Sequence, residues 1–193
     1  MISVIFPFNE AKATEAAAHL LKLRGAPMSY LKLVKLLYLV DREALLEFGR
    51  PVTTDRYVST DQGPSLSKVS DLITVGSAVP SVWSDFVSPL EGDLEVELRR
   101  EAAQGELSDA EVKVIKAIFA HFGQQSRWEL IDYSRTLREW VNPEGTKMPI
   151  EYSDILKAGG KSASEIKAII SELESVAAVI ASLEPWNSGA IVA

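Results

Sequence analysis

Hydrophobic residues at helical spacing predict two helices at the start of the chain. The first, over residues 10–24, follows Asn9, an N-cap residue, and ends at Gly25. The second, over residues 30–48, has Ser29 as its candidate cap and carries hydrophobic residues on nearly every face. A helix of this kind belongs in the middle of a core, so we expect it at the centre of the domain.

Three polar residues interrupt the apolar helix over 30–48. Lys32, Lys35 and Arg42 lie close to one stripe along its surface. We therefore expect a single edge of this helix to meet water or a partner.

Downstream of this helix the pattern becomes that of a strand. Residues 52–61, VTTDRYVSTD, are rich in β-branched and aromatic side chains, which predicts a short strand that Gly63 and Pro64 end. Pro64 suits the first turn of a helix because its missing N–H costs nothing there, so a helix is expected over 65–76. Residues 94–98 alternate between apolar and charged side chains, as in a half-buried strand.

Three serine–glutamate pairs at capping-box spacing predict the remaining helices. These begin after Ser108, Ser126 and Ser162 and run over 109–122, 127–135 and 163–183. The last of them repeats hydrophobic residues along one face and must bury that stripe. Residues 142–161 are rich in proline and glycine, and we expect them to form a long surface connection with one helical turn near 152–157.

Together these elements predict a mainly α chain of the α+β class. We expect a compact helical domain over residues 1–141, with the apolar helix at its centre and a small antiparallel β-sheet of two or three short strands beside it. The surface connection over 142–161 then leads to an appended amphipathic C-terminal helix and tail over 162–193. That helix packs on its own domain, pairs with a second copy in a homo-oligomer, or covers a partner, and the pattern leaves these three open.

Composition favours a cytoplasmic protein. The chain of 193 residues is 47% hydrophobic and 24% charged, as in globular proteins, and no stretch approaches the uninterrupted apolar length of a membrane span. Its first residues, MISVIFPFNEAK, lack the basic start and the cleavage site of a secretory signal. The absence of cysteine fits a reducing compartment and excludes disulfides and thiolate nucleophiles.

The net charge of −7 is unevenly distributed. Residues 12–68 hold nine basic and six acidic side chains, whereas residues 69–193 hold eleven and twenty. This acidity either favours basic partners over phosphate backbones or is ordinary solubility charge. The first interpretation argues against nucleic-acid binding, which we do not expect.

Catalytic motifs are absent from the sequence. It contains no GxxxxGK[ST], GxGxxG, GxSxG or HExxH motif. His19 and His121, its two histidines, fall in separate predicted helices, so we predict no metal site and no cofactor. Asp55 and Asp61 flank the end of the predicted strand and could form a carboxylate pair, although such acids are usually only solvated. We therefore predict a binding protein and not an enzyme.

The segment YVSTDQGPS, residues 57–65, is the most suggestive one chemically. A Gly-Pro junction at a helix start presents unpaired backbone N–H groups, which suit an acidic side chain or a phosphate; the alternative is a tight strand-to-helix corner. Of the four tryptophans, Trp83, Trp128 and Trp140 are expected in the core, whereas Trp186 in the tail could serve at an interface.

Two blocks of the sequence together resemble a known family. The first, from Lys32 to Ile73, combines a lysine-punctuated apolar helix, a Gly-Arg-Pro element, a short strand and a Gly-Pro pair; its marker residues are Lys32, Lys35, Leu36, Tyr38, Asp41, Gly49, Arg50, Pro51, Tyr57, Gly63 and Pro64. The second, from Leu107 to Trp140, includes Leu130. In order and spacing both blocks resemble the Panacea domain, a small domain of bacterial and phage-associated antitoxins. The resemblance covers about residues 10–141 and departs from the family at Ser134 and Arg135, where a Thr-His or Ser-His pair is expected.

This resemblance implies an antitoxin that neutralises a protein toxin from a neighbouring gene by direct binding, with no cofactor. Three alternatives stay open: an adaptor that delivers a toxin to an ATP-dependent protease, a DNA-binding autoregulator of its own operon, and a hydrolase using Asp55, Asp61 or Tyr57. Candidate partner-binding residues come from the polar edge of the central helix, the strand-to-helix corner and the family motifs: Lys32, Lys35, Tyr38, Asp41, Arg42, Tyr57, Asp61, Gly63, Pro64 and Trp140.

Overall fold

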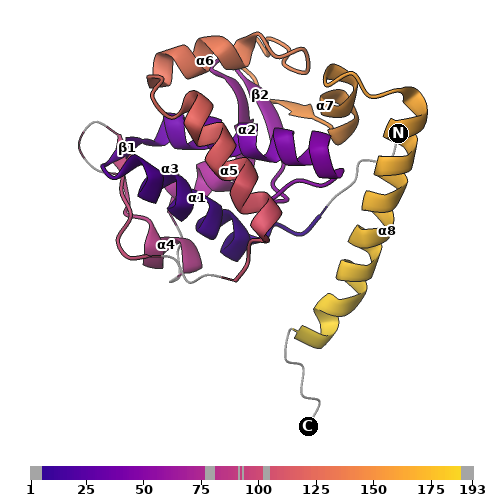
Figure 1. Cartoon of the computed structure of the whole chain (residues 1–193), viewed down its shortest axis with the longest axis horizontal. Helices are drawn as coiled ribbons and strands as arrows, with labels where there is room; N and C mark the ends of the chain where they lie inside the picture. Colours follow the sequence, from indigo (N-terminus) through magenta and orange to yellow (C-terminus); the bar gives the residue numbers. More distant parts are fainter. Residues whose placement is uncertain (1–5, 77–80, 91, 93, 102–104, 188–193) are drawn as a thin grey trace.

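A central helix organises the fold. The computed structural model describes residues 6–76, 81–90, 92, 94–101 and 105–187, with side chains to residue 182. Within these ranges the chain is mainly helical, with two small antiparallel sheets, and α2 (Tyr30–Phe48) runs through its middle (Figure 1). Among the helices that α2 contacts most are α1 (Glu10–Arg24), α5 (Asp109–Phe122), α6 (Arg127–Arg135) and α7 (Tyr152–Ala158). The predicted mainly α, α+β architecture is confirmed.

The side chains of α2 form much of the core. Leu33, Leu36, Leu37, Tyr38 and Leu45 are completely buried. A helix that is apolar all round needs cover on every side, and the contacts of α2 with its neighbouring helices and with strands β1 and β3 provide that cover.

The first two helices have the ends that the sequence predicts. The Oδ1 atom of Asn9 accepts a hydrogen bond from Lys12 N at 2.9 Å and so caps α1. Gly25 (φ 66°) and Gly49 (φ 74°) end α1 and α2 in the left-handed conformation, where their N–H groups close the last turn of each helix.

Ser29 stands at the N-cap position of α2 but makes no capping hydrogen bond through its side chain. It belongs to β1 (Met28–Ser29), which pairs with β4 (Glu95–Val96) in a two-stranded sheet. The buried Ser29 Oγ has no hydrogen-bond partner among the described residues. The strand predicted over 94–98 therefore exists but is short, and its partner is a segment that the pattern assigns to a helix cap.

The strand predicted over 52–61 is part of a hairpin. Strand β2 (Tyr57–Thr60) pairs antiparallel with β3 (Gly63–Leu66), so that Ser59 lies opposite Pro64. The prediction that Pro64 opens a helix is wrong, since α3 (Ser67–Thr74) begins only after β3 ends. Proline is tolerated here because β3 is an edge strand, which needs ladder hydrogen bonds on one side only.

The segment predicted as a surface connection contains a strand and a helix. Strand β5 (Met148–Ile150) pairs with β2, with Ile150 opposite Tyr57, and completes the three-stranded sheet β3-β2-β5. The helical turn expected near 152–157 is confirmed by α7. However, Ile150, Tyr152, Ile155 and Leu156 are buried, because β5 lies on β2 and α7 packs on α2. This part of residues 142–161 therefore belongs to the core and not to the surface.

Helix α8 (Ala163–Asn187) begins with the predicted capping box, in which Ser162 and Glu165 exchange hydrogen bonds. Leu173 is buried, and Ile166, Ile169 and Ile170 pack against the core. The apolar stripe of this helix is thus covered, at least in part, by its own domain.

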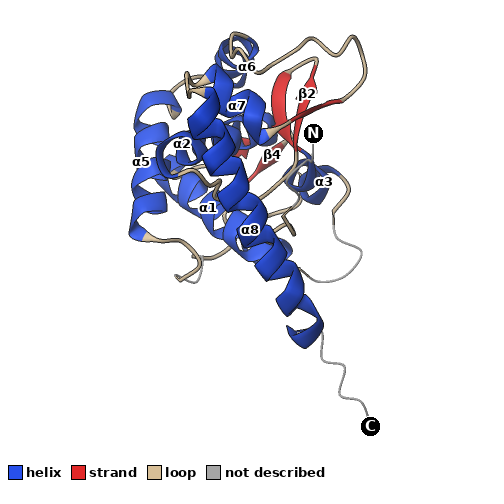
Figure 2. Cartoon of the chain, turned by 90° about the vertical axis from the view of Figure 1, so that its right-hand side faces the viewer, coloured by secondary structure: helices blue, strands red, loops and turns tan. Residues whose placement is uncertain are grey.

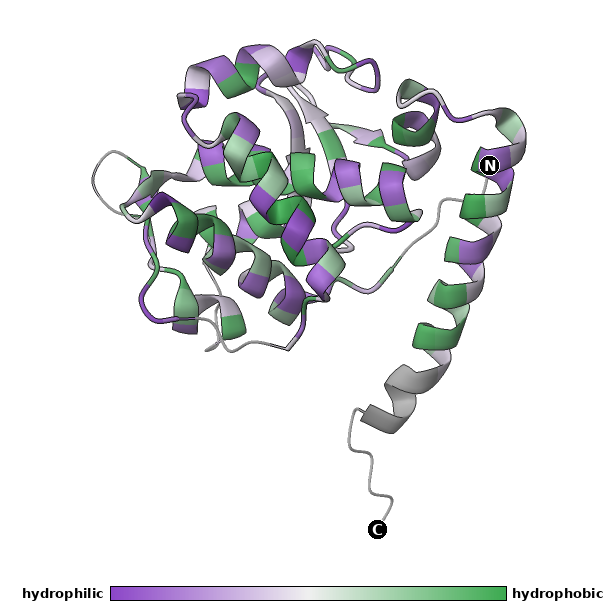
Figure 3. Ribbon diagram, in the orientation of Figure 1, coloured by the Kyte–Doolittle hydropathy of each residue, from purple (hydrophilic) through white to green (hydrophobic). Residues whose placement is uncertain are grey.

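Figures 1 and 2 show α8 along one side of the body, with its C-terminal end directed away from the other helices. Hydrophobic residues recur on successive turns of this helix (Figure 3). Two of them, Val176 and Val179, are exposed. The tail over 188–193 and the side chain of Trp186, for which an interface was considered, lie outside the described residues.

The other tryptophans have different environments. Trp83 lies in α4 (Val82–Phe86) and is buried, as predicted. Trp140 is half-buried. The prediction that Trp128 lies in the core is wrong: its side chain is 58% exposed on α6, beneath the guanidinium of Arg127.

Candidate functional site

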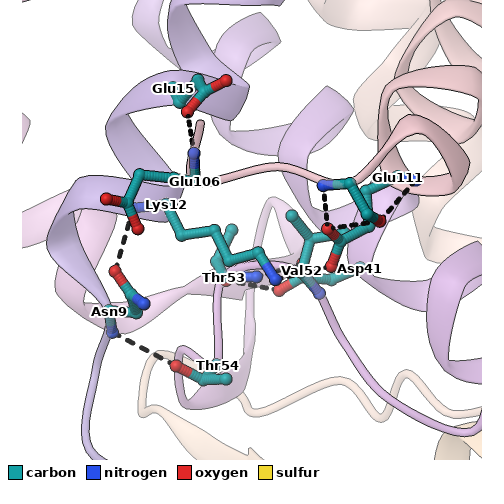
Figure 4. A network of polar contacts seen from close by, with 10 residues as sticks. Asn9, Lys12, Glu15, Asp41, Val52, Thr53, Thr54, Glu106 and Glu111 are labelled. Atoms are coloured by element: carbon teal, nitrogen blue, oxygen red, sulfur yellow. Dashed lines mark hydrogen bonds and ion pairs between the residues drawn. The ribbon is translucent and has the colours of Figure 1, made fainter. Parts of the chain in front are cut away.

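Asp41 is the centre of a buried hydrogen-bond network. Its Oδ1 accepts from Val52 N (2.9 Å) and Thr53 N (2.8 Å), and Figure 4 shows these three residues together. Its Oδ2 accepts from Thr53 Oγ1 (2.5 Å) and Tyr57 OH (3.0 Å). Burial raises the pKa of Asp41 to about 6, although the hydrogen bonds from Thr53 and Tyr57 oppose this shift. The carboxylate thus fixes the segment before β2 onto α2.

Tyr38 and Arg42 connect α2 to the segment after α6. Tyr38 OH donates to Glu139 Oε1 at 3.0 Å, and Arg42 Nε donates to the same oxygen at 2.7 Å. Burial and the neighbouring Glu139 carboxylate raise the pKa of Tyr38 well above its usual value, so it is a neutral donor. The Oε2 atom of Glu139 is buried and has no hydrogen-bond partner in the described part of the chain.

The two lysines of α2 are buried, so the prediction that they form an exposed edge is wrong. Lys32 is 7% exposed and Lys35 is 2% exposed. Lys32 Nζ donates to Gly123 O and to Gln125 O, both at 2.6 Å, and Lys35 Nζ donates to Pro64 O at 2.5 Å. Each ammonium group therefore holds a distant backbone segment by its carbonyl oxygens.

The environment of the lysines follows from the same geometry. Gly123 is the C-cap of α5, and lysine is favourable at such an end because the last carbonyl groups of a helix lack partners. Burial, together with the positive charge of Arg135, lowers the pKa of Lys35 to about 7. Burial, with a contribution from Arg24, also lowers the pKa of Lys32.

Residues 60–63, the turn between β2 and β3, are clamped onto α6 and the segment after it. Arg135 donates through its guanidinium to Asp61 O, at 2.9 Å from Nε. Trp140 Nε1 donates to Thr60 O at 2.9 Å, and Gly145 N donates to Asp61 Oδ1 at 3.1 Å. Arg135, which stands where the family resemblance leads one to expect histidine, therefore holds this turn.

Gly63 is required where the hairpin meets α6. Its φ of +90° lies in the left-handed region. A Cβ at this position would overlap Ser134 Oγ and would lie 3.2 Å from Ser134 Cβ. The Gly-Pro pair thus serves a close backbone approach within a hairpin, and it is not the strand-to-helix corner that the sequence suggested.

The structure does not bring Asp55 and Asp61 together as a carboxylate pair. Asp55 Oδ1 and Oδ2 accept from Lys68 N (2.9 Å) and Val69 N (2.8 Å) at the start of α3. Asp61 is exposed and binds the turn at Gly145. The two carboxylates have no hydrogen-bond partner in common among the residues described.

The two histidines lie on different helices, α1 and α5. His19 Nε2 lies 3.9 Å from Glu15 Oε1, and His121 packs edge-on against Phe122. In the described ranges, no three histidine, aspartate or glutamate side chains are grouped so as to hold a metal ion.

Of the ten candidate partner-binding residues, most are internal. Seven are buried, namely Lys32, Lys35, Tyr38, Asp41, Tyr57, Gly63 and Pro64. Arg42 and Trp140 are half-buried, and Asp61 is exposed. Hydrogen bonds and packing among these residues join α2, the hairpin and the segment after α6 into one body.

Sequence reasoning missed several residues that the structure makes prominent. Glu139 receives both Tyr38 and Arg42. Val141 and Met148 are exposed apolar residues beside a pocket of about 380 Å³. No sequence signal marks this pocket, because its walls come from segments that are adjacent only after the three-stranded sheet has formed.

Comparison with known proteins agrees with this architecture. The family described as the SocA-like antitoxin, Panacea domain, matches residues 33–141, more than half of the chain. Neither the curated proteins nor the solved structures contain a match. Among the described residues, no helix is both long enough and apolar enough to cross a membrane. The matched range includes α2, the hairpin and α6, and the chain therefore belongs to the Panacea-domain family of SocA-like antitoxins.

Proposed function

We propose that this protein is an antitoxin that neutralises a protein toxin encoded by a neighbouring gene by binding it directly. The observation that carries the proposal is the family match over residues 33–141, which includes every candidate residue except Lys32. An antitoxin family indicates a regulatory and non-enzymatic role. The absence of a carboxylate pair or a three-residue metal cluster in the described residues is compatible with that role.

The burial of the motif residues supports a particular division of labour. Buried groups such as Lys35, Asp41 and Gly63 would fix the shape of the domain, and exposed groups around them would contact the toxin. Asp61 at the hairpin turn and Trp128 on α6 are exposed, and tryptophan is enriched among residues that dominate binding energy. We expect both to belong to the exposed surface available to a partner.

Co-expression with the product of the neighbouring gene tests the proposal. We expect that product to arrest growth when it is produced alone, and we expect growth to recover when this chain is produced with it. The two purified proteins should also elute together from a sizing column. A neighbouring product that is harmless alone, or that remains harmful beside this chain, would show the proposal to be wrong.

The same strains distinguish direct neutralisation from delivery to a protease. Direct binding predicts that the toxin persists in the rescued cells, whereas delivery predicts that its lifetime shortens. Toxin abundance after synthesis is stopped measures the difference.

We also propose that α8 can mediate self-association. The exposed Val176 and Val179 lie one turn apart on this helix, and exposed apolar residues on a helix favour pairing. Light scattering of the purified chain should then give a mass above that of one copy. A V176E/V179E variant should be a monomer, and a monomeric unmodified chain would contradict the proposal.

A further inference from the structure

A pocket lies where the segment after α6, strand β5 and helix α7 meet. It has a volume of about 380 Å³, and its lining includes Arg138, Val141, Met148, Pro149, Asp154 and Lys157. None of the ten candidate partner-binding residues lines it, although Glu139, which binds Tyr38 and Arg42, does. The pocket is therefore distinct from the buried network around Asp41.

The pocket has an apolar part that is open to solvent. Val141 is 56% exposed and Met148 is 42% exposed, which is unusual for large apolar side chains in so small an area. Pro149 continues this surface. Apolar side chains grouped around a concave site are the usual means of receiving an apolar group of a partner.

The pocket also has two cationic groups that are not used inside the protein. Neither the guanidinium of Arg138 nor the ammonium group of Lys157 makes a hydrogen bond or an ion pair with any described residue. In a chain with a net charge of −7, two unpaired cations beside one apolar pocket are a local reversal of sign. Such a reversal favours a partner surface that carries negative charge.

The two acidic residues of the lining do not cancel this charge. The side chain of Glu139 is completely buried, and its Oε1 already accepts from Tyr38 and forms an ion pair with Arg42. Asp154 is exposed, but one of its carboxylate oxygens accepts a hydrogen bond from Glu151 N at the start of α7. Asp154 is therefore the one exposed carboxylate of the lining, against one guanidinium and one ammonium group.

The walls of the pocket are held by hydrogen bonds, so the site is formed before a partner arrives. Val141 N donates to Ser59 Oγ at 3.3 Å, and β5 is paired with β2 from Met148 to Ile150. The neighbouring Trp140 is tied to Thr60 O. A site of fixed shape loses less conformational entropy on binding than a mobile one.

We propose that this pocket receives an acidic, apolar segment of the toxin. An aliphatic or aromatic side chain of that segment lies on Val141 and Met148, and adjacent aspartate or glutamate side chains pair with Arg138 and Lys157. This inference rests on the proposed antitoxin function and names the surface through which it operates.

The test compares two charge-reversal variants of the full chain. R138E/K157E changes the pocket, and K113E/K116E makes the same change of charge on α5, where both lysines are exposed. The product of the neighbouring gene is titrated into each protein by calorimetry at two salt concentrations. We expect R138E/K157E to bind about tenfold more weakly or worse, and K113E/K116E to bind within about twofold of the unmodified chain.

A second pair of variants separates the apolar contribution. V141S/M148S should weaken binding while leaving its salt dependence unchanged, because no charge is removed. Thermal unfolding of each variant establishes that it is folded, and R138Q/K157Q replaces R138E/K157E if the latter unfolds. R138Q/K157Q should bind more weakly than the unmodified chain, but by less than the factor expected for R138E/K157E.

The outcomes separate this inference from the function on which it rests. If the unmodified chain does not bind the neighbouring product, the antitoxin proposal is wrong. If it does bind, and R138E/K157E binds equally well or K113E/K116E is impaired to the same degree, the antitoxin proposal stands and the pocket is not the site. Loss of binding confined to the pocket variants supports the inference.

Discussion

The contact between Gly63 and Ser134 allows a quantitative test of how the hairpin is joined to α6. In Gly63→Ala, the new Cβ has to tolerate a φ of +90°, which costs about 1–2 kcal/mol for a residue other than glycine. The same Cβ overlaps Ser134 Oγ, and relieving an overlap in a well-packed interior costs about 1–3 kcal/mol. The variant should therefore be less stable by about 2–5 kcal/mol.

Two further variants separate the backbone cost from the overlap. Gly160 has a similar φ of +85°, and a Cβ there meets no atom within 4 Å, so Gly160→Ala should show the backbone cost alone. Ser134→Ala removes the overlapping Oγ, together with its hydrogen bond to Ile131 O (2.9 Å), at a cost of about 1 kcal/mol. The remaining Cβ of residue 134 is 3.2 Å away and needs only a small shift.

Urea unfolding of the two single variants at Gly63 and Ser134 and of the double variant completes the cycle. We expect the double variant to be more stable than the sum of the single effects predicts, by about 1–3 kcal/mol. Effects that add to within about 0.5 kcal/mol would show that the hairpin and α6 are not in the close contact described, and that φ alone requires glycine here.

Three other predictions concern the buried polar groups of α2. Burial raises the pKa of Asp41 from 3.8 to about 6, so the folded protein binds the proton more tightly than the unfolded chain does. The resulting stabilisation is present below pH 4 and is lost as the pH rises through 6. The free energy of unfolding, measured in urea, should therefore fall by up to about 3 kcal/mol between pH 4 and pH 7, and this fall should be absent in Asp41→Asn. Lys35 has the opposite sign, because its pKa of about 7 favours the neutral form. Stability should therefore rise from pH 7 towards pH 10 in the unmodified chain and rise less in Lys35→Met. Lys32→Met should lower the stability by about 1–3 kcal/mol because Gly123 O and Gln125 O lose their donor, and a midpoint unchanged in urea would contradict this.

Helix ends are the part of this fold that the sequence predicts best, because a cap is made by neighbouring residues. Asn9, Ser108 and Ser126 each accept a hydrogen bond from an N–H group three positions ahead. The hydrophobic pattern does not predict the strand pairings, because they join segments that are distant in the sequence, as in the pairing of β5 with β2. Strand β5 itself has three residues, one of them proline, and so has no detectable periodicity. The same limit explains why residues 142–161 were assigned to the surface.

The ten candidate partner-binding residues remain a prediction from residue types, but the burial of Lys32 and Lys35 reverses the role that the helical pattern suggests for them. A pattern of hydrophobic and polar positions treats every lysine as exposed, whereas Lys32 and Lys35 bury their alkyl chains and direct their ammonium groups to backbone oxygens of other elements. Arg135, which stands where the family resemblance leads one to expect histidine, also binds a backbone oxygen, since its guanidinium donates to Asp61 O.

This arrangement has a consequence for partner choice. Groups that are buried and already hydrogen-bonded cannot distinguish one toxin from another, because a partner does not touch them. Under the proposed function, discrimination between toxins would depend on exposed groups such as Arg138, Val141 and Lys157, which can change without disturbing the network around Asp41. If the pocket is the toxin-binding site that we propose, exchange of its residues alone should alter which toxin the chain binds.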